Sequence, residues 1–312
     1  MEVIKPNPIL KFNNNQLETV RKTLGYDDLN KLKQDIQQLT EWIQMQSHFL
    51  VKEFDPEYLE RLLIYNKGSI ERTKQKFDRL CTCINLMPEF LQNFDIKNEF
   101  VHQLKVIQTC ALPIPTDNNY RILISSPTGE EDEDFMLIQY YRYIILLGNY
   151  MLNNDYCQGY EWVYDSRNIT MALVLKINPI IIQKGLTLLI EAMGHRIKKM
   201  HIISGSKLLD AALVLFKQGL SSKLKERLIV HSDVKSLHDH IPKELLPRDY
   251  GGDQLSVKEL HEALFNELSS DKHVEQVKFM ERAATDESRR HVCRFNEEYS
   301  GMPGSFKTLS VD

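Results

Sequence analysis

Apolar residues in the first third of the chain recur at steps of three and four, the period of an amphipathic helix. Residues 29–46 carry one such stripe, formed by Leu29, Leu32, Ile36, Leu39 and Ile43. Pro56 marks the start of another helix, a break falls at Gly68, and Ser69 caps the helix after it. We therefore predict that residues 1–108 form a small all-helical N-terminal bundle.

The pattern changes after this bundle, where prolines and an Asn pair introduce short apolar runs. The strand candidates are residues 120–125, 160–165, 198–204 and 227–231. Helical stretches fill the intervals, at residues 135–152, 179–193 and 207–218. Strands that alternate with helices predict an α/β domain, which we assign to residues 109–270, with a sheet joined by crossover connections and covered by helices.

The end of the chain carries one clear helix start. Ser256 with Glu259 three residues later forms a capping-box pattern, and the apolar face behind it consists of Leu260, Leu264 and Leu268. We predict that residues 271–312 form a C-terminal helix and tail. The last stretch, residues 304–312, is expected to lie extended against the body of the protein.

Composition and charge exclude some classes of protein. The 312 residues are 42% hydrophobic and 26% charged, and 39 Lys and Arg face 43 Asp and Glu, for a net charge of -4. This balance gives no general attraction to nucleic acid, which we do not expect as a partner. The most apolar long window, residues 136–152, is interrupted by Arg142 and cannot cross a bilayer. Five scattered cysteines and no secretory pattern predict a cytoplasmic protein.

Catalytic patterns are weak. His231, His238 and His240 are clustered, and two of them would point the same way on a strand and could bind zinc, but no further ligand stands at a familiar spacing. Nucleophile elbows, phosphate loops and dinucleotide fingerprints do not occur in the sequence. We expect neither enzyme activity nor a cofactor, and keep a metal-dependent hydrolase as a distant alternative.

Residues 207–220 are apolar on two faces. One face consists of Leu209, Ala212, Leu213, Phe216 and Leu220, and the second of Leu208, Ala211 and Leu215. Such a helix is either buried or a lid with a lipid pocket on one side and a membrane or solvent on the other. The cations that follow it, Lys217, Lys223, Lys225 and Arg227, favour the lid, because they suit an anionic membrane surface.

Residues 241–253 predict a rigid corner. Pro242 can begin a short helical turn, and Pro247 forces Leu246 into an extended conformation. Gly251 and Gly252 can supply positive φ angles and redirect the chain toward the C-terminal helix.

The same corner, Leu246-Pro247-Arg248-Asp249-Tyr250-Gly251-Gly252, resembles the end of the lipid domain in the CRAL-TRIO family of lipid carriers. Residues 198–204 are similar to the family's central strand and residues 221–233 to its basic segment before the next strand. Residues 39–50 and 57–73 resemble its N-terminal helices. The resemblance covers about residues 15–265, and implies a mixed sheet covered by helices, with a mobile lid helix and an all-helical N-terminal part.

Three stretches depart from the family. Ser204-Gly205-Ser206 replaces the usual hinge before the lid, Ser166-Arg167-Asn168 replaces Leu-Glu-Gly, and Ile64-Tyr65-Asn66 stands where basic residues are common. Headgroup-binding residues of the phospholipid-exchanging members are not recognisable, which favours a single-chain hydrophobic ligand.

The resemblance implies a carrier that binds one tocopherol-, retinoid- or other isoprenoid-like molecule beneath the lid and transfers it between membranes. The candidate pocket residues are Tyr143, Leu147, Trp162, Tyr164, Ile169, Leu188, Leu189, Ile197, Met200, Ile202, Leu209, Leu213 and Phe216. The alternative within binding proteins is exchange or sensing of phospholipids and phosphoinositides.

A basic patch accompanies this pocket. Arg196 and Lys198 flank the start of the central strand, and Lys223 and Arg227 stand four residues apart on one helix face. Basic residues stand at the matching positions in the family's phosphoinositide-recognising members. The resemblance therefore implies transient docking, from the cytoplasm, on a membrane surface that carries anionic phosphoinositides.

Overall fold

The computed structural model describes residues 4–203 and 208–290, and in residues 208–212 only the backbone. The predicted hinge at Ser204-Gly205-Ser206 and the predicted extended tail lie outside these residues, as does the side chain of Leu209.

Six helices precede the sheet: α1 (Gln16–Thr23), α2 (Leu29–Met45), α3 (Pro56–Tyr65), α4 (Ile70–Leu86), α5 (Pro88–Leu91) and α6 (Val101–Val106). Their starts follow the predicted capping. Asp55 accepts a hydrogen bond from the Glu57 amide ahead of α3, and Ser69 accepts one from the Arg72 amide in α4. Gly68 separates these two helices with a φ of 69°, a conformation that favours glycine.

The sheet has five strands in the order β1-β2-β3-β4-β5. They are β1 (Ile107–Ala111), β2 (Tyr120–Pro127), β3 (Gly159–Asp165), β4 (Ile197–Ile203) and β5 (Leu228–His231). β1 runs antiparallel to β2 and the other neighbours are parallel, so the sheet is mixed.

Sequence patterns missed β1, and the expected boundary between residues 108 and 109 falls inside it. The strand follows α6 directly, so its apolar residues continue a helical run. What makes it a strand is pairing with β2 and packing against helix α13 (Val257–Leu268), both of which are non-local.

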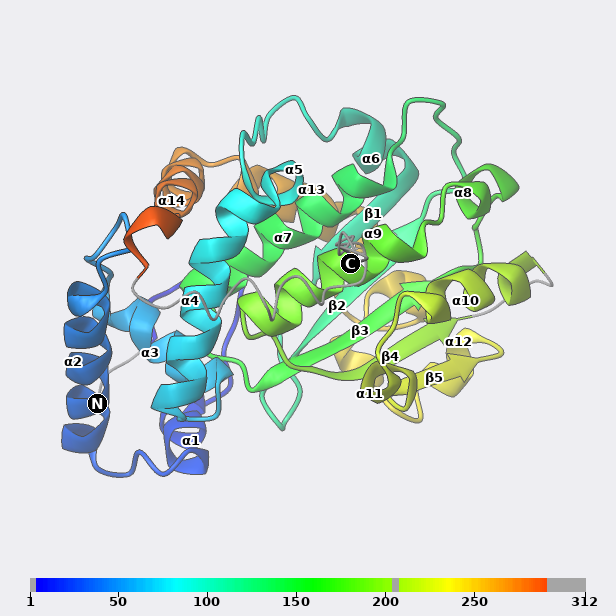
Figure 1. Ribbon diagram of the computed structural model, residues 1–312. Coiled ribbons are helices and arrows are strands. Elements are labelled where there is room, and N and C mark those ends of the chain that lie inside the picture. Colours follow the sequence, from blue (N-terminus) through cyan, green and yellow to red (C-terminus); the bar gives the residue numbers. More distant parts are fainter. Residues whose placement is uncertain (1–3, 204–207, 291–312) are drawn as a thin grey trace.

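Helices cover both faces of the sheet (Figure 1). One face carries α7 (Leu137–Asn154), α8 (Met171–Leu175), α9 (Pro179–Thr187) with its π-helical extension (Leu188–Ala192), and α10 (Leu208–Gln218). The chain reaches β5 through α11 (Ser222–Lys225). The other face carries α12 (Val234–Leu237) and α13, which begins with the predicted capping box.

The predicted corner is present between α12 and α13. A short turn (Lys243–Leu245) follows Pro242, a second (Arg248–Tyr250) follows Pro247, and Gly251 has a φ of 73°. Gly252 serves a different purpose from the predicted one: a Cβ there would meet the Leu246 carbonyl oxygen at 2.0 Å, so the position needs glycine for close approach.

The last described elements return to the N-terminal helices. Helix α14 (Asp271–Arg282) packs on α7, and the Leu50 amide donates to the Ala284 carbonyl. The guanidinium of Arg290 donates to both carboxylate oxygens of Asp78 on α4, at 2.8 and 3.0 Å. One continuous hydrophobic cluster therefore joins the N-terminal helices, the sheet and the C-terminal helices.

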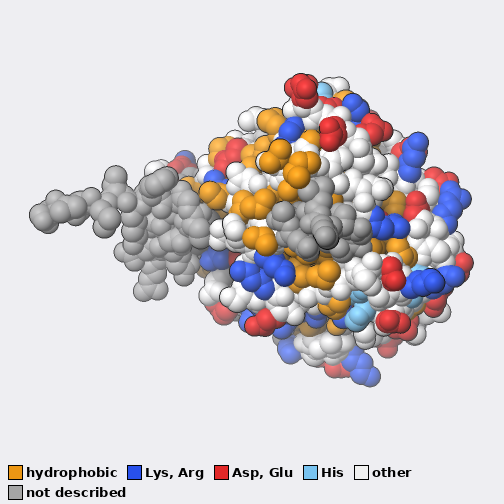
Figure 2. All heavy atoms as spheres, turned by 90° about the vertical axis from the view of Figure 1, so that its right-hand side faces the viewer, with side chains coloured by type: hydrophobic (Ala, Val, Ile, Leu, Met, Phe, Trp, Pro, Cys, Tyr) orange, Lys and Arg blue, Asp and Glu red, His pale blue; other side chains and the backbone are white. Residues whose placement is uncertain are grey.

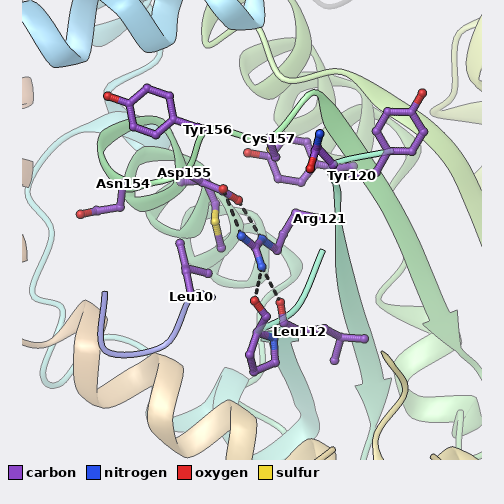
Figure 3. A network of polar contacts seen from close by, with 12 residues as sticks. Leu10, Leu112, Tyr120, Arg121, Asn154, Asp155, Tyr156 and Cys157 are labelled. Carbon is purple, nitrogen blue, oxygen red and sulfur yellow. Dashed lines mark hydrogen bonds and ion pairs between the residues drawn. The ribbon is translucent and has the colours of Figure 1, made fainter. Parts of the chain in front are cut away.

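A buried ion pair lies where these parts meet (Figure 3). Arg121 on β2 donates two hydrogen bonds to Asp155 at the end of α7, at 2.8 and 3.1 Å, and both side chains are fully shielded from solvent. The same guanidinium donates to the backbone carbonyls of Lys11, Leu112 and Pro113. It therefore connects the N-terminal segment, the turn between β1 and β2, and α7.

We predict that Asp155→Ala lowers the free energy of unfolding by about 3–5 kcal/mol, because it leaves the Arg121 charge buried without its partner. Urea denaturation checks this. Lys5→Ala removes an exposed ion pair with Glu57 and serves as the control, with no measurable effect expected. Equal midpoints for Asp155→Ala and the wild type would contradict the role of the pair.

Candidate functional site

An apolar cavity of about 120 Å³ lies between the sheet and α10. Its walls come from three layers: strands β2 and β3 with β4, the start of α7, and helices α8 to α10. The lining residues are Ile107, Ser125, Pro127, Leu137, Tyr140, Tyr141, Tyr164, Asp165, Ser166, Ile169, Leu173, Ile177, Ile182, Ile202, Leu213 and Phe216.

Five predicted pocket residues line this cavity, namely Tyr164, Ile169, Ile202, Leu213 and Phe216. Seven others pack in the main hydrophobic core and do not line it: Tyr143, Leu147, Trp162, Leu188, Leu189, Ile197 and Met200. Of these seven residues, Trp162 contacts the cavity lining, because its ring stacks on that of Tyr164 with centroids 5.2 Å apart. The structure thus brings together residues of α10 and the far ends of β3 and β4.

Sequence reasoning missed the aromatic wall formed by Tyr140 and Tyr141. Residues 140–152 of α7 are all buried, so periodicity could not distinguish the face toward the cavity from the face toward the core. The residues chosen there, Tyr143 and Leu147, lie further along the helix, and Tyr143 packs against Phe100. Gly185 on α9 makes room for this wall, because a Cβ there would lie 2.1 Å from the Tyr141 ring.

Polar groups gather at one side of the cavity. The Ser125 hydroxyl accepts hydrogen bonds from the Tyr140 hydroxyl at 2.9 Å and from the Trp162 indole at 3.2 Å. The Tyr164 hydroxyl is buried and has no hydrogen-bond partner among the described residues. A buried hydroxyl without a partner is costly, so this oxygen suits a polar group of a bound molecule.

The outside of this region is also apolar. Figure 2 shows hydrophobic side chains gathered on the face that carries α8 and α10. The exposed members, which we call the apolar face, are Met171 and Leu175 on α8, Ile180 on α9, Val214 on α10 and Val230 on β5. Leu175 is 78% exposed. Contiguous exposed apolar side chains of this kind are typical of surfaces that contact a membrane or a partner.

A second, larger cavity of about 620 Å³ is basic, and we call it the basic cleft. It contains all four residues of the predicted patch, Arg196, Lys198, Lys223 and Arg227. The N-terminal helices add further cations: Lys67, Arg72, Lys76 and Arg79. The lining contains one acidic residue, Glu191.

Local structure positions the cations of β4. Tyr160 pairs with Ile197 and Glu161 with Lys199, so Lys198 is the extra residue of a β-bulge, a feature that redirects a side chain. Its ammonium lies 4.8 Å from the centre of the Tyr120 ring. The guanidinium groups of Arg196 and Arg227 donate to the backbone carbonyls of Gln158 and Ile197.

Comparison with known proteins assigns the sheet region. Residues 108–252 match the family model described as the CRAL/TRIO domain. These residues form a CRAL/TRIO domain. The predicted family and its α/β fold, a mixed sheet covered by helices and preceded by a helical region, are thereby confirmed.

The relatives of this chain are distant. An alpha-tocopherol transfer protein-like protein of Mus musculus is 23% identical over 221 residues, which are 70% of this chain and 64% of the mouse protein. Clavesin-2 of Rattus norvegicus is 23% identical over 135 residues, 42% of this chain and 41% of its own. The crystal structure of Sfh5 covers 81% of this chain and 93% of its own at 12% identity, with a TM-score of 0.44. The chain therefore spans just under two thirds of the mouse protein.

The predicted histidine cluster of the CRAL/TRIO domain is not gathered around one point. His238 faces the Tyr250 carbonyl at 2.8 Å, while His231 bonds the ring of His201 at 2.9 Å. The ring of His240 lies 5.3 Å from that of His231. Among the described residues, the group with metal-ligand spacing is instead His102 on α6 with Asp132 and Asp134 in the loop before α7. Within the same residues, no helix is long and apolar enough to cross a membrane.

Buried histidines make stability depend on pH. Burial, with the nearby charges of His201 and His240, lowers the pKa of His231 to about 4, and burial lowers the pKa of His195 to about 3. The unfolded chain, with pKa values near 6.5, therefore binds more protons than the folded protein in this range. The stabilising contribution is complete above pH 6.5 and declines as the pH falls toward 4.

We predict that the free energy of unfolding decreases between pH 6.5 and pH 4.5, and that His231→Gln reduces this dependence. One such group contributes a slope of at most about 1.4 kcal/mol per pH unit. Urea denaturation at pH 7.5, 6.0 and 5.0 measures it. Lys225→Ala, at an exposed cation on α11, is the control and should keep the wild-type slope; a His231→Gln slope equal to the wild type would contradict the assignment.

Proposed function

We propose that this protein is a carrier that binds one small hydrophobic molecule beneath α10 and transfers it between membranes. The observation that carries the proposal is the apolar cavity between the sheet and α10, with Leu213 and Phe216 of that helix in its wall. The CRAL/TRIO domain and the name of the tocopherol transfer protein-like relative support the same class of ligand, a tocopherol, retinoid or other isoprenoid.

Binding requires the cavity to grow. Ligand pockets usually enclose about 300–1,000 Å³, whereas this cavity has about 120 Å³. The cluster beneath α10 is a small one apart from the main core, and its fully buried members among the described residues are Val174 and Ile202. Few buried contacts make opening inexpensive, so α10 is the element that moves outward. Burying about 400 Å² of ligand at ~25 cal/mol/Å² offsets this with roughly 10 kcal/mol before association costs.

The polar side of the cavity favours a ligand with one polar end. Tyr164, Ser125 and Tyr140 all line the cavity, and the unpartnered Tyr164 hydroxyl suits a single alcohol, phenol or carbonyl group. An isoprenoid alcohol or a chromanol has this chemistry, whereas a saturated hydrocarbon does not.

The outer surface supports transient membrane docking. The apolar face lies around α8 and α10 (Figure 2), and the basic cleft begins at residues 219–221, directly after α10. Each cation near an anionic surface contributes about 1 kcal/mol, so Arg196, Lys198, Lys223 and Arg227 together provide ~4 kcal/mol. We propose that phosphoinositide headgroups are the anions and that the protein works in the cytoplasm, associating peripherally with membranes.

A phosphoinositide-exchanging or -sensing protein is the second candidate. The observation that favours it is the volume of the basic cleft, about 620 Å³ against about 120 Å³ for the apolar cavity. Organic extraction of the purified protein with mass spectrometry separates the two, because a carrier retains an isoprenoid-like molecule and an exchanger retains a phospholipid. Metal analysis of the same sample tests the distant hydrolase alternative.

We predict that Leu213→Asp and Phe216→Asp lower ligand retention at least tenfold, because each places a charge against an apolar wall. Quenching of Trp162, which stacks on the cavity residue Tyr164, reports binding of tocopherol, retinoid or phospholipid probes. Val214→Asp on the exposed side of α10 is the control and should keep ligand affinity while slowing transfer to vesicles. If Val214→Asp lowered ligand affinity as much as Leu213→Asp and Phe216→Asp do, α10 would be a core helix and not a lid.

We also predict that Lys223→Ala with Arg227→Ala reduces binding to vesicles that contain phosphatidylinositol bisphosphate, most strongly at low salt. Vesicle co-sedimentation measures it, with phosphatidylcholine vesicles as the baseline. Lys225→Ala, an exposed cation on α11 outside the cleft, should have little effect. Unchanged binding of the double variant would remove the patch from the mechanism and leave the lipid cavity untouched.

A further inference from the structure

The loop between β2 and α7, residues 128–136, borders the apolar cavity. Pro127 and Leu137, which stand on either side of this loop, both line the cavity. The loop contains five consecutive acidic residues, Glu130 to Asp134, and we call it the acidic strap. Because both of its ends lie in the cavity wall, movement of the strap changes the rim of the cavity.

Helix α6 holds the acidic strap on one side. The Thr128 hydroxyl donates to the Lys105 carbonyl at 2.8 Å. The Asp132 carboxylate lies 3.0 Å from Nδ1 of His102 and 3.5 Å from the Lys105 ammonium. The Phe135 side chain is buried in the main hydrophobic cluster. The strap is therefore attached to the body of the protein at its start, its middle and its end.

Lys176, which directly follows α8, holds the acidic strap on the other side. Its ammonium donates hydrogen bonds to the backbone carbonyls of Asp132, Glu133 and Phe135, at 2.9, 2.7 and 2.9 Å. An ammonium has three N–H donors, so all of them are used here. Within the described part of the chain, every hydrogen bond from residues 168–177 to a distant segment comes from this ammonium. Lys176 therefore connects α8 to the strap.

Little else fixes α8 in place. The helix has five residues, of which Leu173 and Val174 are buried, whereas Leu175 is 78% exposed. Leu173 lines the apolar cavity, and α10 packs on α8. A short element with few buried contacts opens at low cost. Release of α8 would therefore uncover the cavity from one side and remove a support of α10, the helix that moves outward under the proposed function.

We propose that the acidic strap and Lys176 form a clasp that keeps α8 over the apolar cavity, and that an anionic membrane surface opens the clasp by repelling the carboxylates of the strap. The inference rests on the proposed function, because it takes α8 and α10 as the cover of a ligand cavity. It adds the element that controls when this cover moves.

The charges of the acidic strap support this trigger. Four of its carboxylates are exposed and form no ion pair within residues 4–203 and 208–290: Glu130, Glu131, Glu133 and Asp134. Met171 and Leu175 of the apolar face lie on α8, directly before Lys176. Docking through that face brings the strap toward the membrane, where an anionic surface acts on charges over about 8 Å at physiological ionic strength. The repulsion therefore pulls on the segment that Lys176 holds.

The test measures how fast the full chain releases nitrobenzoxadiazole-labelled tocopherol, by stopped-flow fluorescence. Release is followed without vesicles, with phosphatidylcholine vesicles, and with vesicles that also contain phosphatidylserine. We expect Lys176→Met to release the probe at least tenfold faster than the wild type without vesicles, because the clasp is already open. Phosphatidylserine should accelerate release from the wild type at least tenfold over phosphatidylcholine alone.

A second variant removes the charge of the acidic strap and keeps Lys176. It combines Glu130→Gln, Glu131→Gln, Glu133→Gln and Asp134→Asn. Without vesicles it should release the probe no faster than the wild type, and phosphatidylserine should accelerate its release less than threefold. Co-sedimentation at the same vesicle concentrations shows that the variant is bound, so that a slow release is not a failure to dock.

Matched controls remove the same charges elsewhere. Lys184→Met deletes a cation on α9 that pairs with Glu89 at 3.3 Å and does not contact the strap. A control for the carboxylates neutralises four exposed residues on α1, α2, the segment before α3 and α14, namely Glu18, Glu41, Glu53 and Glu275. Both controls should release the probe as the wild type does. Thermal unfolding confirms that each variant is folded, and Lys176→Gln replaces Lys176→Met if the latter is not.

Either of two results overturns the proposal. One is release from Lys176→Met that is as slow as release from the wild type, and the other is undiminished acceleration by phosphatidylserine in the variant without strap carboxylates. Failure of the proposed function looks different, because the wild type itself would then bind neither the labelled tocopherol nor retinoid and phospholipid probes.

Discussion

The fully buried pair of Arg121 and Asp155 fixes how the parts of this protein meet. Removing two charges from water is expensive, and the cost is offset here by two charge-assisted hydrogen bonds and by three backbone carbonyls that take the remaining donors. These partners come from the N-terminal segment, the turn before β2 and the end of α7. A small shift of any of them would leave a buried charge unsatisfied, so the pair permits one arrangement of helices on the sheet.

Both cavities depend on that arrangement. Tyr160, the strand neighbour of Arg121, shares a 2.6 Å hydrogen bond with the hydroxyl of Tyr65, and Tyr65 lines the basic cleft. The helix that Asp155 ends also begins the aromatic wall of the apolar cavity, at Tyr140 and Tyr141. The apolar cavity and the basic cleft are therefore placed by a single frame, while α10 packs chiefly on α8 and α9.

The sequence alone predicts those features that depend on residues close together in the chain. Caps at Asp55, Ser69 and Ser256 and the proline-glycine corner could be predicted because each depends on residues within a few positions. The second strand through the fifth followed from alternation with helices. The four cations of the patch came from the family resemblance, and the structure gathers them in one cleft. β1 and the aromatic wall could not be predicted, because pairing with β2 and the orientation of a helix buried on all sides are set by distant residues. The cations that α4 adds to the basic cleft were missed for the same reason, because Arg72 and Arg79 look like an ordinary solvated face until α4 is placed beside β4.

Residues 219–221 connect two features of the protein, helix α10 and the basic cleft. They directly follow α10, where Gly219 lies so close to Ile182 that a Cβ would meet it at 2.7 Å, and they also line the basic cleft. Under the proposed function, a bound anion and a bound lipid would both act on this stretch of backbone. Thermodynamic linkage makes any such effect reciprocal: the factor by which the headgroup changes the affinity for the lipid equals the factor by which the lipid changes the affinity for the headgroup. The occupancy of one site is therefore expected to set how firmly the other site holds its ligand.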